Sequence, residues 1–134
     1  MYIKYAILAD SITSVDEGKT NIIGTFDRMY SSDFPVLIPR FSLFIKFEID
    51  PKEEKKRYKF KLVFIDQNGV SKREPYEKTL TFPKRKNGAT PNEPQVIINI
   101  KNMIIAEPGL YEFAIYIDGR YLYGVPLDVA QTTS

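Results

Sequence analysis

The chain contains no cysteine, no histidine and no tryptophan. Without cysteine it has no thiol nucleophile, no thiolate ligand for zinc or an iron–sulfur cluster, and no disulfide. Without histidine it lacks the side chain that titrates nearest neutral pH and that most often binds metals. A nucleophilic site would therefore need serine or threonine with a lysine base, or a pair of carboxylates.

The residues that remain for such chemistry lie in charged stretches that are typical of turns. Ser71-Lys72 adjoins a turn, and the paired carboxylates Asp16-Glu17 and Glu53-Glu54 are flanked by other polar residues. Solvent at such places keeps carboxyl groups at ordinary acidity. The chain also has no glycine-rich phosphate loop and no calcium-loop spacing. We therefore expect a non-enzyme with no catalytic residue, no cofactor and no metal site.

Long hydrophobic runs are missing as well. The apolar run Tyr5–Ala9 ends at Asp10, whereas a secretory segment needs about 7–15 apolar residues and a membrane span about 18. We expect this run to form the first strand, with no membrane span. Absence of cysteine fits a reducing compartment, so a cytoplasmic location is the expectation.

What is present is typical of a folded domain. The 134 residues are 43% hydrophobic and 13% aromatic, which is more than disordered chains carry. No stretch is repeated or of low complexity. A single domain over residues 1–134 is expected.

Hydrophobic residues alternate with polar ones along several segments, for example Phe41, Leu43, Ile45, Phe47 and Ile49. Such alternation predicts strands with one buried face. Strands are predicted at 2–10, 20–29, 41–50, 57–66, 76–82, 95–102, 110–117 and 120–129. About eight short strands favour an all-β antiparallel sandwich of immunoglobulin-like type. The apolar segment 30–40 is expected to cross between strands and plug one end of the sandwich.

Two turns set the expected pairing of strands. Asp118-Gly119 is a strong type I′ hairpin signal, and it would pair Tyr116 with Tyr121 and Ile115 with Leu122. Tyr116, Tyr121 and Tyr123 would then share the outer face. A two-residue turn at Asn68-Gly69 would leave Leu80 and Phe82 facing outward, so a bulge is expected there, with Gly69 in the left-handed region.

Residues 107–113, Glu-Pro-Gly-Leu-Tyr-Glu-Phe, have the spacing of an immunoglobulin tyrosine corner. In that motif the Tyr hydroxyl bonds to the backbone upstream, and the residue two positions later fills the core. The chain also resembles a bacterial family of small proteins filed as a domain of unknown function. This resemblance rests on Tyr5–Asp10, Asn21–Arg28, Phe34-Pro35, Glu107–Tyr111, Asp118-Gly119 and Val125–Leu127. It implies a stand-alone β-sandwich without assigned catalytic residues.

Charge is unevenly distributed. Residues 51–86 hold twelve Lys or Arg against five Asp or Glu, whereas the rest holds seven against twelve. The basic segment 52–86 predicts either a solubilising face or a site for nucleic acid or another polyanion. A third reading is that the basic half of one molecule meets the acidic half of another. The candidate basic residues are Lys55, Lys56, Arg57, Lys59, Lys61, Lys84, Arg85 and Lys86.

The tyrosine hairpin supplies the second candidate surface. Tyr116, Tyr121 and Tyr123, with Arg120 beside them, are residue types enriched at protein interfaces. The alternative is that the rings lie flat over their own sheet. We expect a non-catalytic protein–protein interaction or assembly module, with an unknown partner or a second copy; a polyanion binder is the alternative.

Overall fold

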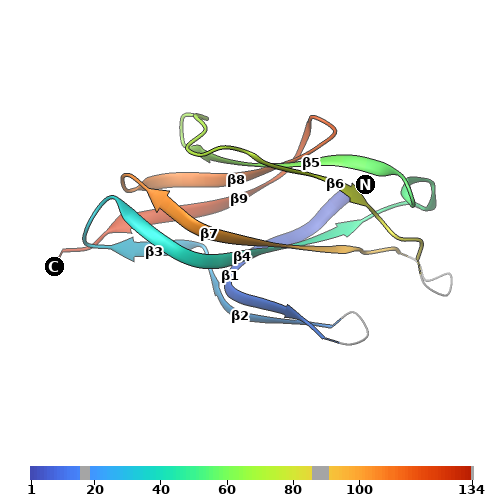
Figure 1. Ribbon diagram of the computed structural model, residues 1–134, viewed down its shortest axis with the longest axis horizontal. Coiled ribbons are helices and arrows are strands. Elements are labelled where there is room, and N and C mark those ends of the chain that lie inside the picture. The colour runs from blue at the N-terminus through green and yellow to red at the C-terminus, as the bar shows by residue number, and fades with distance from the viewer. Residues whose placement is uncertain (16–18, 86–90, 134) are drawn as a thin grey trace.

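The protein is described from a computed structural model that covers residues 1–15, 19–85 and 91–133. Within these residues the chain forms nine strands and one short 3₁₀ turn, η2 (Pro51–Glu53) (Figure 1). The strands are β1 (Tyr2–Ser14), β2 (Thr20–Phe26), β3 (Arg28–Ser31), β4 (Val36–Glu48), β5 (Arg57–Asp66), β6 (Tyr76–Thr81), β7 (Gln95–Ile105), β8 (Gly109–Ile117) and β9 (Arg120–Gln131).

The strands form two sheets that pack face to face (Figure 1). One sheet has the order β2-β1-β4-β7 and the other β3-β9-β8-β5-β6. Neighbouring strands are antiparallel except β3 and β9, which run parallel. The prediction of an all-β, two-layer protein is confirmed.

The ninth strand arises because the predicted segment 20–29 is divided at Asp27. Phe26 pairs with Leu8 in the first sheet, and Arg28 pairs with Asp128 in the second. The chain thus changes sheets within three residues, and this crossing joins the two layers along one side. The Asp27 carbonyl accepts a hydrogen bond from the Asp128 N–H at 2.9 Å, which fixes the crossing.

The core lies between the two sheets and follows the alternation of the sequence. Phe113 in β8 contacts Phe41 across the core with ring centroids 5.9 Å apart, and Phe64 on the neighbouring strand at 4.8 Å. Burial of these apolar side chains is the main stabilising term of such a fold. Further core residues include Leu8, Leu43, Ile45, Phe47, Phe60, Ile98, Met103, Ile115 and Leu127.

A second apolar cluster lies on the opposite side of the first sheet. The β1–β2 hairpin curls the sheet so that the Thr20 hydroxyl of β2 donates to the Gln95 side chain of β7 at 2.8 Å. Under the hairpin, Phe44 is only 1% exposed and packs with Ile12 and Ala9. In the alternating pattern of residues 41–49, Phe44 falls between the predicted inward residues and is therefore predicted to lie on the more exposed face of the strand. That prediction is wrong because the hairpin covers this face.

The segment 30–40 differs from its prediction in part. Residues 36–40 belong to β4 and pair with β7 instead of forming a connection. Ile38 is buried, and Phe34 and Val36 pack against the core, as a plug requires. Leu37 is 54% exposed, because in a strand it points away from its buried neighbours.

The pairing of β5 with β6 confirms the predicted displacement at Asn68-Gly69. Leu62 lies opposite Tyr76, and Leu80 and Phe82 are buried. Gly69 has φ of 78°, in the left-handed region. The turn itself closes with the Asp66 N–H donating to the Val70 carbonyl at 3.0 Å. The bridge between Ile65 and Ser71 keeps the register of the turn, so the displacement is taken up after it, between Ser71 and Tyr76.

At the start of β8, the Tyr111 hydroxyl donates a hydrogen bond to the Glu107 carbonyl at 2.5 Å. Burial raises the pKa of this hydroxyl, since the charged phenolate would lose its hydration. Two residues later Phe113 fills the core. The bond therefore holds the β7–β8 connection against the strand that carries a central core residue.

Candidate functional site

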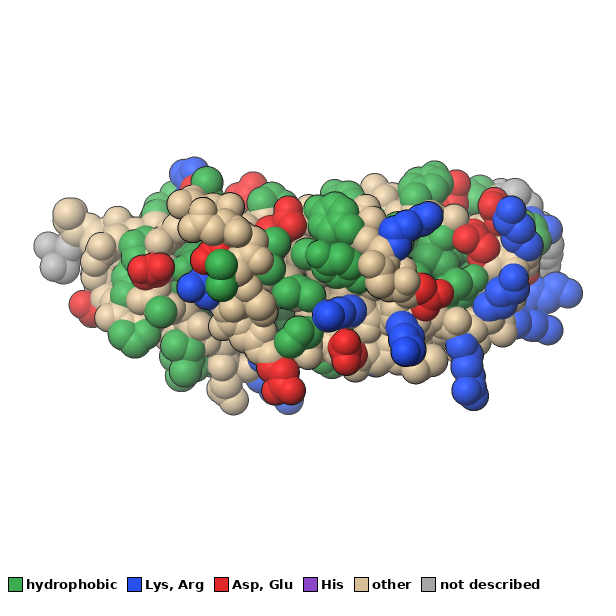
Figure 2. Space-filling model, turned by 90° about the horizontal axis from the view of Figure 1, so that it is seen from above, with side chains coloured by type: hydrophobic (Ala, Val, Ile, Leu, Met, Phe, Trp, Pro, Cys, Tyr) green, Lys and Arg blue, Asp and Glu red, His purple; other side chains and the backbone are tan. Residues whose placement is uncertain are grey.

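The outer face of the five-stranded sheet carries several of the residues predicted to form a site, among them both outward tyrosines. In antiparallel strands, paired residues project from the same side. One row contains Glu77, Lys61, Tyr116 and Tyr121, from four adjacent strands. Within the described ranges no further layer covers this face, and Figure 2 shows it as a mixed surface of apolar and charged side chains.

The hairpin at Asp118-Gly119 begins as predicted and then changes register. Both turn residues have positive φ, and Tyr116 pairs with Tyr121. A bulge between Ile115 and Tyr116 then pairs Ile115 with Tyr123 instead of Leu122. Tyr123 consequently faces the core side and packs against it. The predicted group of three outward tyrosines is thus reduced to two.

Tyr116 and Tyr121 form an edge-to-face pair with ring centroids 5.7 Å apart. The Tyr121 hydroxyl hydrogen-bonds the Glu112 carboxylate directly above Gly124, where a side chain would collide with both groups. Burial, together with the Glu112 charge, raises the pKa of Tyr121. The pair thus lies over its own sheet, yet Tyr121 remains 49% exposed. Arg120 is exposed, but it pairs with the buried Ile117 and therefore projects from the opposite side of the hairpin, away from the tyrosine pair.

Sequence reasoning missed the apolar residues on the same face. Leu110 of β8 is 56% exposed and Tyr30 of β3 is 63% exposed. Both share this face because Leu110 pairs with Asp128, and Tyr30 pairs with Ala130 two residues along β9. Leu110 could have been placed on this face from the sequence, because it lies two residues before Glu112 in the same strand, and residues two apart share a face. Tyr30 could not be placed without knowing that β3 joins this sheet.

The basic residues gather at one end of the molecule. Lys55 donates its N–H to the Phe82 carbonyl at 2.9 Å, and Arg85 donates its N–H to the Glu54 carboxylate at 3.1 Å. These bonds bring residues 54–57 beside 82–85, so Lys55, Lys56, Arg57, Lys84 and Arg85 lie near one another. Figure 2 shows most blue side chains at this end. Lys86 lies outside the described residues.

Lys59 and Lys61 extend the basic region onto the outer face. The Asp118 carboxylate accepts the Lys59 N–H at 2.8 Å, so the tip of the β8–β9 hairpin lies against β5. Lys61 pairs with Tyr116 on the neighbouring strand. The structure thus brings the tyrosine pair and part of the basic segment together on one surface. Sequence reasoning had treated these as two separate candidates.

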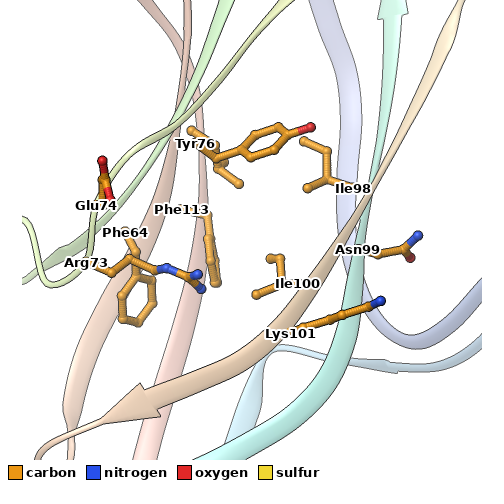
Figure 3. Close-up of a pocket in the computed structure, with 10 residues that line it drawn as sticks. Phe64, Arg73, Glu74, Tyr76, Ile98, Asn99, Ile100, Lys101 and Phe113 are labelled. Carbon is orange, nitrogen blue, oxygen red and sulfur yellow. The ribbon is translucent and has the colours of Figure 1, made fainter.

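A small cleft of about 80 Å³ opens at the side of the sandwich between β6 and β7 (Figure 3). Its floor is formed by buried side chains of the core, including Phe64, Ile100 and Phe113. Arg73 points into it from the segment before β6, and Tyr76 lies across its mouth. The cleft can hold one apolar side chain, but it is smaller than ligand pockets usually are.

Among the described residues, no group of three or more carboxylates is arranged to hold a metal ion. The Ser71 hydroxyl donates to the Arg73 carbonyl at 2.9 Å, and the Lys72 amine lies 3.5 Å from the Asp66 carboxylate. Each member of the Ser71-Lys72 pair therefore contacts a different group. No helix in the described part of the chain has the length and apolar character to cross a membrane.

Comparison with known proteins gives a family and no activity. The profile of a family of unknown function (DUF6941) matches residues 4–130, and the chain belongs to this family. No curated protein matches. Among solved structures, the Pseudomonas fluorescens alkylpurine DNA glycosylase AlkC bound to DNA containing an abasic site analog is similar with a TM-score of 0.46 and 9% identity. The match covers 77% of this chain and 27% of that chain.

Proposed function

We propose that this member of the DUF6941 family is a non-catalytic module that binds another protein through the outer face of its five-stranded sheet. The observation that carries the proposal is the Tyr116–Tyr121 pair on an uncovered sheet, with exposed Leu110 on the same face. Tyrosine suits protein interfaces because its ring is buried on binding while its hydroxyl keeps a hydrogen bond. Here Glu112 already supplies that bond.

The Tyr121 side chain is also fixed in place before any partner binds. The Tyr121 ring is held against Gly124 by its contact with Tyr116 and by the Glu112 carboxylate. A side chain that is fixed before binding loses little conformational entropy when a partner arrives. The surrounding charges then favour an acidic partner, since Lys59 and Lys61 lie on one side of the pair, whereas Asp128 on the other side is ion-paired with Arg28.

The test compares a face variant with a control. Tyr121→Ser combined with Leu110→Ser removes two exposed apolar groups from the face, and Ile104→Ser removes one of similar exposure from β7. Proteins captured from native lysate by the wild type and by Ile104→Ser should be lost with the double variant. Light scattering on each purified protein tests self-association in the same way. The same captured proteins and the same mass for all three would refute the proposal.

We also infer that the sandwich is related to immunoglobulin-like domains. Three observations support this. The parallel β3–β9 pair closes one side of the sandwich, β8 lies centrally in its sheet beside β5, and Tyr111 bonds to the backbone four residues upstream. In immunoglobulin domains a Tyr at the start of the corresponding strand makes such a bond, and the residue two positions later is central to the core. Phe113 has that place here.

A second candidate function is binding of a polyanion, and the grouping of residues 54–57 with 82–85 favours it. Basic side chains from two distant segments meet at one end, where their potentials add. A nucleic acid bound there would release counterions, so affinity would fall steeply with salt.

The polyanion reading can be tested by titrating single-stranded and duplex DNA at low salt. Lys56→Gln, Arg57→Gln and Lys84→Gln together should reduce the slope of log affinity against log salt by roughly 0.7–0.9 for each phosphate that is no longer neutralised. The control removes three exposed charges elsewhere and should leave the slope unchanged: Lys19→Gln, Arg40→Gln and Lys101→Gln. Absence of binding at low salt, or equal slopes, would exclude this function.

A further inference from the structure

The two sheets differ in width, and the difference leaves a vacant place beside β7. The first sheet ends at β7 after four strands, whereas the second continues to a fifth strand, β6. The cleft of Figure 3 lies between these two edges, with Ile98 and Ile100 on one wall and Tyr76 on the other. Tyr76 is 44% exposed, because no strand of the first sheet lies against it.

Among residues 1–15, 19–85 and 91–133, no strand pairs with the edge of β7 that faces this place. Ile49 and Phe47 donate their N–H groups to the carbonyls of Asn92 and Pro94, at 3.0 and 2.9 Å. In an antiparallel ladder every second residue bonds to the same neighbour. Because the β4–β7 register is unbroken, Ile98 and Ile100 bond to β4. The N–H and C=O groups of Asn99 and Lys101 therefore point to the free edge.

This edge lacks the usual protection against strand pairing over much of its length. Edge strands are commonly blocked by an inward-pointing charge or by proline. β6 has such a charge, since Lys78 lies opposite the buried Phe60 on the core side. β7 runs for 11 residues, and its inward residues from Val96 to Ile100 are all apolar. Its edge is therefore suited to accept a further strand.

The charges around the vacant place are mostly positive: Arg73 and Lys101 line the cleft, and Glu74 is the one carboxylate among its lining residues. The Arg73 guanidinium points into the cleft, and Asn99 and Lys101 point away from it on the outer side of the sheet (Figure 3). Lys78 faces the same space from β6. Across the described residues, none of these three cations forms an ion pair. A strand added to β7 would thus meet cations on both of its faces.

We propose that the free edge of β7 binds an extended segment of a partner protein in which apolar residues alternate with acidic ones. The apolar residue would enter the cleft beside Ile98 and Ile100. Its acidic neighbours would project from the opposite side of the added strand and lie near Lys101 on the outer side. Main-chain hydrogen bonds would supply affinity, and the cleft and cations would supply specificity. This site is separate from the tyrosine face and does not depend on the proposed function.

The test measures fluorescence anisotropy with a labelled nine-residue peptide in which glutamate alternates with valine. A matched peptide with lysine in place of glutamate is the control. The acidic peptide should give a saturable signal that weakens with salt, and the basic peptide should give none.

Backbone pairing is tested by Lys101→Pro, which removes a free-edge N–H and leaves the bonds to β4 intact. Lys101→Thr removes the charge but keeps the N–H. Lys101→Pro should weaken peptide binding on the order of tenfold, as loss of one hydrogen bond and one charge predicts. Lys101→Thr should weaken it only about two- to threefold. Circular dichroism confirms that both variants are folded.

Five outcomes would overturn the proposal. The wild type does not bind the acidic peptide; the basic peptide binds equally well; or Lys101→Pro and Lys101→Thr bind alike. In the fourth, a doubled mass in light scattering that is lost in Lys101→Pro would show that a second copy occupies the edge. Competition by sodium hexanoate with no effect of Lys101→Pro would assign the cleft to a small amphiphile, and this too refutes strand addition.

Discussion

Replacing Phe44 by Ala tests whether the β1–β2 hairpin is held by its own apolar cluster. Phe44 lies on the outer side of the first sheet and is 1% exposed because the hairpin covers it. Its ring stacks on Tyr5 with centroids 5.9 Å apart. Truncation removes the largest member of the cluster and leaves the main core between the sheets unchanged.

The expected loss can be placed within a known range. Truncating a buried Phe to Ala costs about 3–5 kcal/mol, depending on how far the surroundings collapse into the cavity. One wall of this cavity is a two-stranded hairpin that can move inward, so we expect the low end, about 3 kcal/mol. For a domain of this size, such a loss lowers the melting temperature by about 10 °C.

Denaturant unfolding gives the free energy, and hydrogen exchange shows where the effect lies. In Phe44→Ala the amides of β2 should exchange through local opening, at a lower free energy of opening than the amides of β8, which report global unfolding. Phe113→Ala is the matched control, because this ring contacts Phe41 and Phe64 in the main core. It should cost about 4–5 kcal/mol and affect exchange throughout the sheets.

Two results would refute this reasoning. A loss below about 1 kcal/mol would mean that the cluster contributes no more than a surface contact. Equal free energies of opening for the amides of β2 and β8 in Phe44→Ala would mean that the hairpin and the sandwich unfold as one unit. Either result would mean that the two apolar clusters do not stabilise separate parts of the fold.

Three further predictions concern single bonds and titration. Tyr111→Phe removes one hydrogen bond and should lower the free energy of unfolding by about 1 kcal/mol in urea. Gly124→Ala should displace the Tyr121 hydroxyl, seen as a fall in the phenol pKa by ultraviolet titration. Hydrogen bonds, chiefly the one from the Val70 N–H, lower the pKa of the Asp66 carboxyl group, and burial raises the pKa of the Tyr111 hydroxyl. Stability followed by melting temperature should therefore fall below pH 3.8 and above pH 10.0, with a plateau between; a midpoint near pH 6–7 would contradict this.

The strands were predictable because each follows a period of two, which the backbone geometry imposes. The register of β5 on β6 was predictable for a stronger reason, since only one displacement buries both Leu80 and Phe82. The same argument could have found the bulge in the β8–β9 hairpin. Val125, Leu127 and Val129 are buried, and a regular two-residue turn would have placed them outward.

Contacts between distant segments were not predictable from alternation. The pattern gives each strand a buried face but does not say which strands are neighbours. Phe44 illustrates this. Its neighbours Leu43 and Ile45 are also apolar, and the residues that cover it come from a hairpin earlier in the chain. The cleft at β7 has the same origin, since it depends on how many strands each sheet contains. The basic segment was visible in the composition, but its meeting with Tyr116 required the β5–β8 pairing.

The parallel pairing of β3 with β9 has a consequence for the order in which the protein folds. Residues 28–31 bond to residues 128–131, so the side of the sandwich that they close stays open until the last strand has been synthesised. Forming this contact requires closure of a loop of about 100 residues, and loops of this length make folding slow. A nascent chain therefore exposes the β9-facing edge of β8 until β9 has been synthesised, and this interval is when chaperones or self-pairing have access to it.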